Sequence, residues 1–276
     1  MMDVRWWRRG GAGWLVRARA RSLVAMLVLA IAGLVGASSS WARLVHIQRL
    51  AHAKHATSPR LAKAVKLAGL RVRGIDVSYY QGDIDWRAVR ASGTTFAYIK
   101  ATEGGDHLDS KFKRNWRAAK AAGVRRGAYH FYSLCRPVRE QIAWFEANVP
   151  RDPEALPPAL DMEWVPISKH CRARLSRAKI FADLKMFLAS LERHYGKRPV
   201  IYATASFHRD VLEGALPRYP FWLRSVDGPP GKRYAFRQWH FWQYSAKGSL
   251  PGIRGNVDKN AFAGTPAQWA RFASGT

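Results

Sequence analysis

Asp161 and Glu163 form an acidic pair inside the apolar segment 156–164, which reads LPPALDMEW. Acidic residues are scarce in this chain, with 19 Asp and Glu against 46 Lys and Arg. Pro157 and Pro158 exclude a helix through this segment and favour an extended chain. In a strand, residues i and i+2 share a face and lie about 6.6–7 Å apart. The spacing therefore places both carboxylates on one side of a short strand, as a candidate acid-catalysis pair or as a solvated acidic rim.

Strand and helix patterns alternate from residue 73 onward. Short apolar segments predict strands over 74–78, 94–103, 125–133, 158–164 and 198–204. Helical spacing of apolar residues predicts helices between them, over 85–93, 108–123, 137–150 and 174–196. The last third differs, because predicted strands follow one another with little helix between them, over 219–226, 236–245 and 251–253. This order predicts an α/β fold, an irregular (β/α) barrel with five β/α units and a β-rich last third.

Polar side chains lie near the C-terminal ends of these predicted strands. The active site of a β/α barrel is found at that end, which favours a catalytic role for the pair that ends the fourth strand. Other polar residues take matching positions: Asp76, Lys100, Glu103, His130, Tyr132, Tyr202 and Gln243. Asp258 lies in the segment VDKN near the close of the domain, a pattern that is more often a turn. Taken together, these positions predict one site at one rim of the barrel.

Seven segments in order resemble glycoside hydrolase family 25, the lysozymes that cut bacterial wall glycan. They cover residues 73–264 and read GIDVSYYQGDIDW, FAYIKATEG, AGVRRGAYHFY, LPPALDMEW, RPVIYAT, WQYSAKG and GNVDKNAF. The resemblance implies an N-acetylmuramidase that hydrolyses peptidoglycan glycan strands, and we expect neither a cofactor nor a metal ion. It also implies that Glu163 is the general acid and that Asp161, Asp76 and Asp258 are its acidic partners. A catalytically inactive wall-binding or scaffolding domain on the same barrel is the alternative.

The chemistry of glycoside cleavage agrees with these residue types. The reaction needs an acid that protonates the leaving oxygen and a negative group that supports an oxocarbenium-like state. Glu163, crowded by Asp161 and Trp164, is expected to keep its proton longer than a free Glu. Their spacing leaves retention and inversion open, whereas the resemblance favours retention, with the substrate's acetamido oxygen as nucleophile. Several aromatic residues offer flat faces for sugar rings, with core packing as the alternative for each: Tyr79, Tyr129, Tyr132, Trp164, Tyr202 and Trp222.

The N-terminal residues predict export. Residues 1–21 carry six Arg, residues 22–42 carry no charge, and residues 23–37 form an apolar run. This pattern is typical of a signal peptide, and an uncleaved membrane anchor that contacts the bilayer is equally open. Residues 43–72 are basic and predict a solvated linker with some helical tendency, followed by the hydrolase domain over 73–276. We therefore expect the domain outside the cytoplasm, either secreted, periplasmic or anchored.

Charge and cysteines add two further expectations. The chain has a net charge of +27, and residues 74–276 still carry 32 Lys and Arg against 18 Asp and Glu. This excess indicates an anionic partner, and with export and no nucleic-acid motif the expected partner is an anionic wall polymer. Cys135 and Cys171 follow the third and fourth predicted strands, so their loops lie on the rim that carries Glu163. An oxidising compartment favours a disulfide between them, with two free thiols as the alternative.

Overall fold

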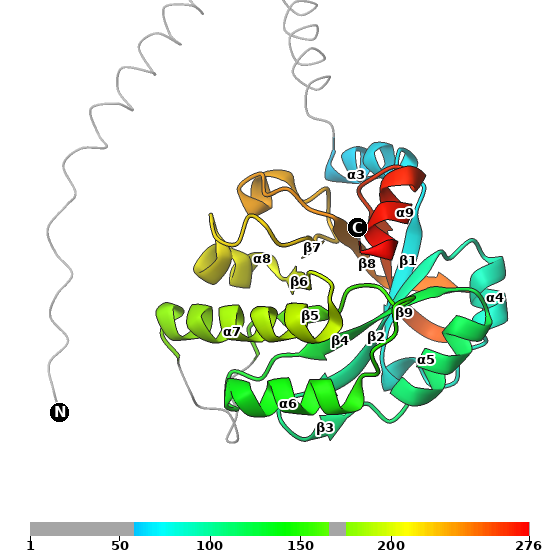
Figure 1. Cartoon of the computed structure of the whole chain (residues 1–276). Coiled ribbons are helices and arrows are strands. Elements are labelled where there is room, and N and C mark those ends of the chain that lie inside the picture. Colours follow the sequence, from blue (N-terminus) through cyan, green and yellow to red (C-terminus); the bar gives the residue numbers. More distant parts are fainter. Residues whose placement is uncertain (1–57, 166–174, 276) are drawn as a thin grey trace, which may run out of the picture. The chain divides into compact units, whose positions relative to one another are not determined.

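The structure is a computed structural model that describes residues 58–165 and 175–275 (Figure 1). The predicted signal peptide or anchor, the linker up to residue 57 and Cys171 lie outside the described residues. Within the described residues, no helix is long and apolar enough to span a membrane.

Eight strands close into a barrel. In spatial order they are β1 (Arg73–Val77), β9 (Ile253–Phe262), β8 (Phe241–Leu250), β7 (Phe221–Arg224), β6 (Val200–Ala203), β5 (Ala159–Met162), β4 (Arg125–Phe131) and β2 (Phe96–Glu103). Pairing of β1 with β2 closes the ring, and the two-residue β3 (His107–Leu108) adds to the edge of β2. β9 is antiparallel to both of its neighbours, whereas the other barrel pairs are parallel. The predicted α/β barrel is confirmed.

Helices cover the outside of the first half of the barrel (Figure 1). They are α4 (Trp86–Ala91), α5 (Phe112–Ala121), α6 (Val138–Asn148) and α7 (Arg177–Tyr195). The second half has only short elements between strands: α8 (Ala205–Phe207), η2 (His208–Leu212) and η3 (Gly231–Tyr234). The short helix η1 (Tyr79–Gln81) follows β1, and α9 (Pro266–Ser274) follows β9. Asp85 caps the start of α4, because its carboxylate accepts hydrogen bonds from the backbone N–H groups of Arg87 and Ala88.

Large aromatic side chains fill the barrel interior below the site. Phe96, Tyr98, Trp222 and Phe241 form part of one buried cluster with Trp269 of α9. Tyr98 stacks on Trp222 with ring centroids 4.9 Å apart. Gly127 makes room for Tyr98, since a Cβ at this position would lie 2.4 Å from the tyrosine ring. We call Phe96, Tyr98, Phe241 and Trp269 the aromatic layer. It packs beneath Trp222, and the polar residues of the barrel interior begin at that side chain.

The last two strands differ from their sequence-based prediction. We expected strands over 236–245 and 251–253, whereas β8 and β9 form a long hairpin that turns at Pro251 and Gly252. Gly252 has φ of 90°, a left-handed conformation that glycine adopts easily. The predicted turn at Asp258 was wrong, because this residue lies within β9 and pairs directly with Asp76 of β1. Backbone pairing on both sides of β9 outweighs the local turn preference of VDKN.

The described part of the predicted linker is helical and mostly exposed. Residues 59–68 form the helix α3 (Pro59–Ala68), which contacts the barrel. Leu67 and Leu70 pack near Trp242 on the outer face of the β8–β9 hairpin, in a small cluster with Trp239 and Tyr244. No long helix lies between β7 and β8 or between β8 and β9. α3 covers the outer face of the hairpin instead. The compact unit therefore begins at Ser58.

Candidate active site

A pocket of about 580 Å³ lies at the C-terminal ends of the barrel strands. We call it the acidic pocket. Four carboxyl groups line it, from Asp76, Asp161, Glu163 and Asp258. The other lining residues are Val77, Ser78, Tyr80, Gln81, Lys100, Tyr129, Phe131, Tyr202, Thr204, Trp222, Arg224, Gln243 and Ala246. The structure thus brings together all four acids that the sequence proposed as catalytic.

Strand geometry explains why the acidic pair points into the barrel. Asp161 and Glu163 lie two residues apart at the end of β5, so both share the inward face, while Met162 between them packs in the outer core. The pair projects above Ala159, whose small side chain belongs to the interior cluster. The expected arrangement of Asp161 and Glu163 on one face is therefore present.

Asp76 sits at the centre of a buried hydrogen-bond network. Its Oδ2 accepts from Asn260 Nδ2 at 2.6 Å and from Gln243 Nε2 at 3.1 Å. Gln243 in turn accepts from the Tyr202 hydroxyl at 3.0 Å, and Asn260 accepts from Trp222 Nε1 at 2.8 Å. The network ties Asp76 to strands from the opposite side of the barrel and leaves it little freedom to move.

Asp76 and Asp258 form a carboxyl pair. They face each other across β1 and β9 and hydrogen-bond to one another. Burial, with the charge of Asp258 as the next cause, raises the pKa of Asp76 well above its usual range. Burial also raises the pKa of Asp258, against the hydrogen bond from Asp76. Two neighbouring negative charges are costly, so the hydrogen bond and the raised pKa values favour one proton shared between the two carboxyls.

Asp161 and Glu163 are both shifted towards the protonated form. Burial raises the pKa of Asp161 well above its usual range, and the charges of Glu163 and Asp76 add to the effect. Burial raises the pKa of Glu163 as well, while the nearby cation of Arg224 opposes the shift. Asp161 Oδ1 is buried and has no hydrogen-bond partner among the described residues. This oxygen is therefore an acceptor that awaits a donor from a bound molecule.

Two cations face the four acids. Arg224 ends β7 and lowers the pKa of both Glu163 and Asp258. Lys100 of β2 is buried at the pocket wall and donates to Glu103 Oε2 at 2.6 Å. Aromatic rings of Tyr80, Tyr129 and Trp222 line the same space. The pocket thus combines proton-holding carboxyls with flat apolar faces, as a site for a sugar chain requires.

Comparison with known proteins agrees with this geometry. The model of the family described as "Glycosyl hydrolases family 25" matches residues 75–253. Lysozyme M1 of Streptomyces globisporus is 38% identical over 216 residues, which cover 74% of this chain and 72% of that protein.

This chain belongs to glycoside hydrolase family 25. It is therefore a glycoside hydrolase by family. Solved family 25 structures superpose on it, including a hydrolase from Bacillus anthracis with a TM-score of 0.69 and 36% identity. A lysozyme from Streptomyces coelicolor has a TM-score of 0.66 and 37% identity. Each match covers 74% of this chain and 94% or 97% of the solved one, so the family 25 barrel is nearly the whole of those chains.

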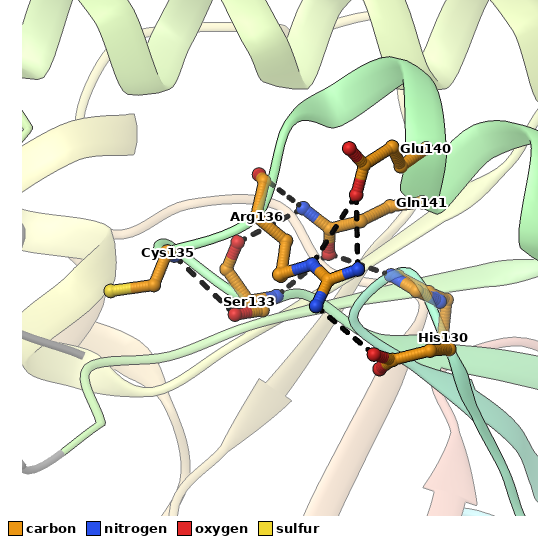
Figure 2. A network of polar contacts seen from close by, with 7 residues as sticks. His130, Ser133, Cys135, Arg136, Glu140 and Gln141 are labelled. Atoms are coloured by element: carbon orange, nitrogen blue, oxygen red, sulfur yellow. Dashed lines mark hydrogen bonds and ion pairs between the residues drawn. The ribbon is translucent and has the colours of Figure 1, made fainter. Parts of the chain in front are cut away.

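Two predicted binding residues of this family 25 chain lie outside the acidic pocket. His130 is fully buried behind β4, where Nδ1 contacts Thr102 Oγ1 at 2.7 Å and Nε2 contacts Gln141 Oε1 at 3.0 Å (Figure 2). The Tyr132 hydroxyl donates to Asp183 of α7 at 3.4 Å. Residues 129 and 131 of β4 point inward, so alternation turns 130 and 132 outward and corrects both predictions.

Three further predicted residues are close to the pocket without lining it. Glu103 pairs with Lys100, as described above. Trp164 lies next to Glu163, but its indole N–H donates to Asp210 Oδ2 at 3.0 Å and its ring packs on Phe207. Tyr79 contacts the ring of Tyr80 at 4.1 Å, and it is Tyr80 that lines the pocket.

Sequence reasoning missed several residues of the family 25 pocket. Arg224, Tyr80, Phe131 and Asn260 were not proposed, although each contacts the acids or the pocket space. Arg224 follows Trp222 by two residues at the end of β7, so the strand-end rule applied to that strand would have found it. Asn260 could be found only after β9 was known to be a strand beside β1.

Cys135 lies in the loop after β4, which side chains hold firmly. Gln141 is fully buried, accepts from Ser133 N at 2.8 Å and donates to the carbonyl oxygens of Ser133 and Arg136 at 2.9 and 3.0 Å (Figure 2). Arg136 pairs with Asp106 and Glu140. Since Cys171 lies outside the described residues, the Cys135–Cys171 disulfide stays a prediction.

Across residues 58–165 and 175–275, no three His, Cys, Asp or Glu side chains are grouped in a way that could hold a metal ion.

Proposed function

We propose that this chain is an exported lysozyme, an N-acetylmuramidase that hydrolyses the β-1,4 bond between N-acetylmuramic acid and N-acetylglucosamine in peptidoglycan. The observation that carries the proposal is the meeting of four carboxyl groups in one pocket, two of them on one strand face. Lysozyme M1 and the Streptomyces coelicolor lysozyme are relatives whose names agree with it. Reaction with retention and with help from the substrate's acetamido group belongs to the same proposal.

The role of each acid depends on which carboxyl groups in the pocket carry a proton. Lys100 is already paired with Glu103, and the pKa values of all four pocket carboxyls are raised, which favours protonated forms. In the resting state of this proposal, two of the four carboxyls carry a proton. One proton is shared by Asp76 and Asp258, and the other belongs to the Asp161–Glu163 pair. Glu163 is the less deeply buried of these two and reaches furthest from the strand end, so it is the acid that meets the glycosidic oxygen. Asp161 then carries the negative charge.

In the first step, Glu163 donates its proton to the glycosidic oxygen. The bond from this oxygen to C1 of N-acetylmuramic acid breaks, and the N-acetylglucosamine side leaves with a hydroxyl group. The acetamido carbonyl oxygen of the same N-acetylmuramic acid forms a bond to C1 and closes a five-membered ring. Asp161 accepts the amide N–H of that group through Oδ1, the buried oxygen without a partner, and stabilises the positive ring.

In the second step, water attacks C1 and opens the ring. The carboxylate of Glu163 now takes a proton from the water, which restores the acid for the next cycle. Two inversions at C1 give net retention. Asp76 stays in place through its bonds to Asn260 and Gln243, and its pair with Asp258 keeps negative charge beside the developing oxocarbenium ion.

Product analysis on purified peptidoglycan tests the proposal. We expect new reducing ends on N-acetylmuramic acid, identified by mass after borohydride reduction, and a β-anomer as first product in a rapid NMR measurement. A first-formed α-anomer would contradict retention, and new reducing ends on N-acetylglucosamine would contradict the proposed bond. Wall binding without any release of reducing ends would instead support the inactive, wall-binding alternative.

Export belongs to this proposal because peptidoglycan lies outside the cytoplasm. It is supported by the Arg-rich start and the uncharged segment 22–42 of the sequence. Fractionation of the producing cell, with an antibody against the barrel, separates a secreted product from one that stays with the membrane.

A further inference from the structure

Helix α3 contacts the barrel through Leu67 and through two of its lysines. Lys63 and Lys66 are directed towards the barrel, where their ammonium groups lie 5.9 Å from the ring centre of Tyr244 and 5.8 Å from that of Trp239. Lys63 also donates to the carbonyl oxygen of Val226 at 2.7 Å. A helix on a water-facing surface normally buries apolar residues and exposes its lysines. In α3, two lysines contribute to the contact between the helix and the barrel.

The opposite side of α3 is apolar and exposed. It consists of Leu61, Ala64, Val65 and Ala68, spaced at i, i+3, i+4 and i+7, and we call it the apolar face of α3. Leu61 is 56% exposed and Val65 66% exposed, and no residue of this helix is fully buried. Their exposure has an energetic cost in water that a covering surface would remove.

Charge around this face indicates what covers it. Arg60 and Arg71 are exposed at either end of the segment, and no acidic residue occurs anywhere from Val4 to Ile75. Asp227 is the acidic residue near this helix, in the pocket that Arg60 and Lys63 also line. An apolar face on a segment that carries only basic residues matches an anionic bilayer surface, where acyl chains take up the apolar residues and headgroups pair with the arginines.

The position of α3 in the chain also indicates a membrane as the partner. The uncharged segment 22–42 ends only 16 residues before Pro59. Even a fully extended connection would span at most about 58 Å, so a bilayer that holds this segment keeps α3 within reach of its surface. Effective concentration then allows a weak helix–lipid contact to form.

We propose that α3 docks the barrel on the surface of an anionic membrane through Leu61, Ala64, Val65 and Ala68. The docking goes beyond the proposed hydrolase function, since none of these residues lies in the acidic pocket. Docking of this kind would give the barrel a fixed orientation on the membrane surface.

A fluorescent label on the full chain tests this contact. Ala64→Cys, in a Cys135→Ser/Cys171→Ser background, carries an environment-sensitive dye in vesicles of phosphatidylcholine with about 30% phosphatidylglycerol. We expect blue-shifted emission that is quenched by spin-labelled lipid and protected from aqueous iodide. Met186→Cys on α7, which is 39% exposed, is the matched control and stays accessible to iodide. Equal iodide access at both positions would overturn the proposal.

Two other outcomes would also overturn it. A blue shift already present in detergent and unchanged by lipid would mean that residues 1–57 cover the face. A shift that disappears on dilution together with a dimer peak would mean that a second copy does. Hydrolysis of glycan by the labelled protein shows in each case that the barrel is folded, independently of the docking result.

A binding assay with residues 58–276 supplies the second readout, because the solved family 25 relatives show that such a barrel is a folding unit. We expect Leu61→Gln/Val65→Gln to lower its partitioning to phosphatidylglycerol vesicles about tenfold. Met186→Gln should leave partitioning unchanged, and glycan hydrolysis should be equal in all three proteins. Unchanged partitioning of the double variant would contradict the docking surface.

Discussion

At the scale of single residues, the protein uses burial to divide four similar carboxyl groups into different roles. Asp76 is fixed by amide donors from two strands, Asp161 keeps one oxygen unpartnered, and Glu163 stands beside it near the opening of the pocket. The residue type alone does not distinguish them. Their partners do, because each hydrogen bond or neighbouring charge changes the free energy of one protonation state.

Glu163→Gln should remove most of the hydrolysis and leave the fold intact. Glutamine has nearly the same shape as the protonated acid but cannot release a proton to the leaving oxygen. Loss of a general acid typically lowers turnover by about 100- to 10,000-fold. Reducing-end release from peptidoglycan measures the effect, and circular dichroism checks the fold. A folded Glu163→Gln protein with normal turnover would assign the acid role to another residue.

The raised pKa of Glu163 also predicts how activity depends on pH. Since burial raises this pKa above the usual value of a Glu, the carboxyl stays protonated in mildly acidic solution and loses its proton as pH rises further. kcat/KM should therefore fall on the alkaline side of its optimum. Arg224→Gln removes a cation that opposes the shift, so it should move this alkaline limb to higher pH. A limb that moves to lower pH would contradict the assignment.

Stability should respond to the same groups. An acid whose pKa is raised on folding favours the native state below its unfolded pKa, and this contribution is lost as pH rises through the folded pKa. Relative to wild type, Asp161→Asn should therefore become more stable as pH rises from about 4 to 7. The buried His130 and His208, whose pKa is lowered to about 4, act in the opposite direction in both proteins and cancel in the difference. Denaturant unfolding at several pH values measures it.

At this scale the sequence predicted the acids better than their surroundings. Asp161 and Glu163 could be recognised from two-residue spacing in a segment that proline makes extended. His130 and Tyr132 were misplaced because a strand alternates, and which parity faces inward depends on neighbouring strands. Asn260 acts through a contact between neighbouring strands that no local pattern contains, whereas Arg224 could have been found from its place at the end of β7.

At the scale of elements, small residues decide whether the aromatic layer fits beneath the pocket. Gly127→Ala should lower the free energy of unfolding by about 1–3 kcal/mol, since its Cβ would meet the Tyr98 ring that supports Trp222. Gly69→Ala is the matched control, because Gly69 has a φ of −78° and its Cβ would meet nothing closer than 3.6 Å. Urea unfolding of both variants separates the steric effect from the general effect of losing a glycine. Equal stabilities would show that the barrel interior relaxes.

The loop after β4 makes a second prediction at this scale. Gln141 and Arg136 fix the backbone on both sides of Cys135, so this cysteine is presented in one orientation at the rim (Figure 2). We predict a disulfide with Cys171 in exported protein, with a stabilisation of about 2–4 kcal/mol. Mass spectrometry of the exported chain, digested with and without reductant, identifies the linked peptides. Two unlinked cysteine peptides without reductant would contradict the prediction.

Strands and helices were predictable where apolar residues recur at a regular spacing. The first five barrel strands and the four outer helices follow apolar periodicity and clear caps such as Asp85, and all are present. The β8–β9 hairpin was not found, because its Pro251–Gly252 turn was taken for a strand and its long strands are partly polar. α3 belongs to the segment predicted as a linker with some helical tendency, and the contacts of Lys63 and Lys66 with aromatic rings of the barrel could not be read from its basic composition.

At the scale of the whole molecule, positive charge is spread over the chain, while the acidic pocket is an exception within it. Residues 74–276 carry 32 Lys and Arg against 18 Asp and Glu, and four of those acids are the pocket carboxyls. The surface outside the pocket is therefore more positive than the net value indicates. Such a surface attracts an anionic polymer over distances that no single contact reaches.

Binding to an anionic wall should therefore weaken as salt is added. The Glu163→Gln protein, which leaves the glycan uncut, is sedimented with purified wall at low and at high salt. We expect affinity to fall about tenfold or more between roughly 0.01 M and 0.3 M salt, as the screening length shrinks from about 30 Å to below 10 Å. Wall stripped of anionic polymers is the control and should bind less strongly at low salt but show a smaller change. If the affinity for intact wall did not change with salt, contacts between the sugar rings and the acidic pocket would by themselves account for the attachment.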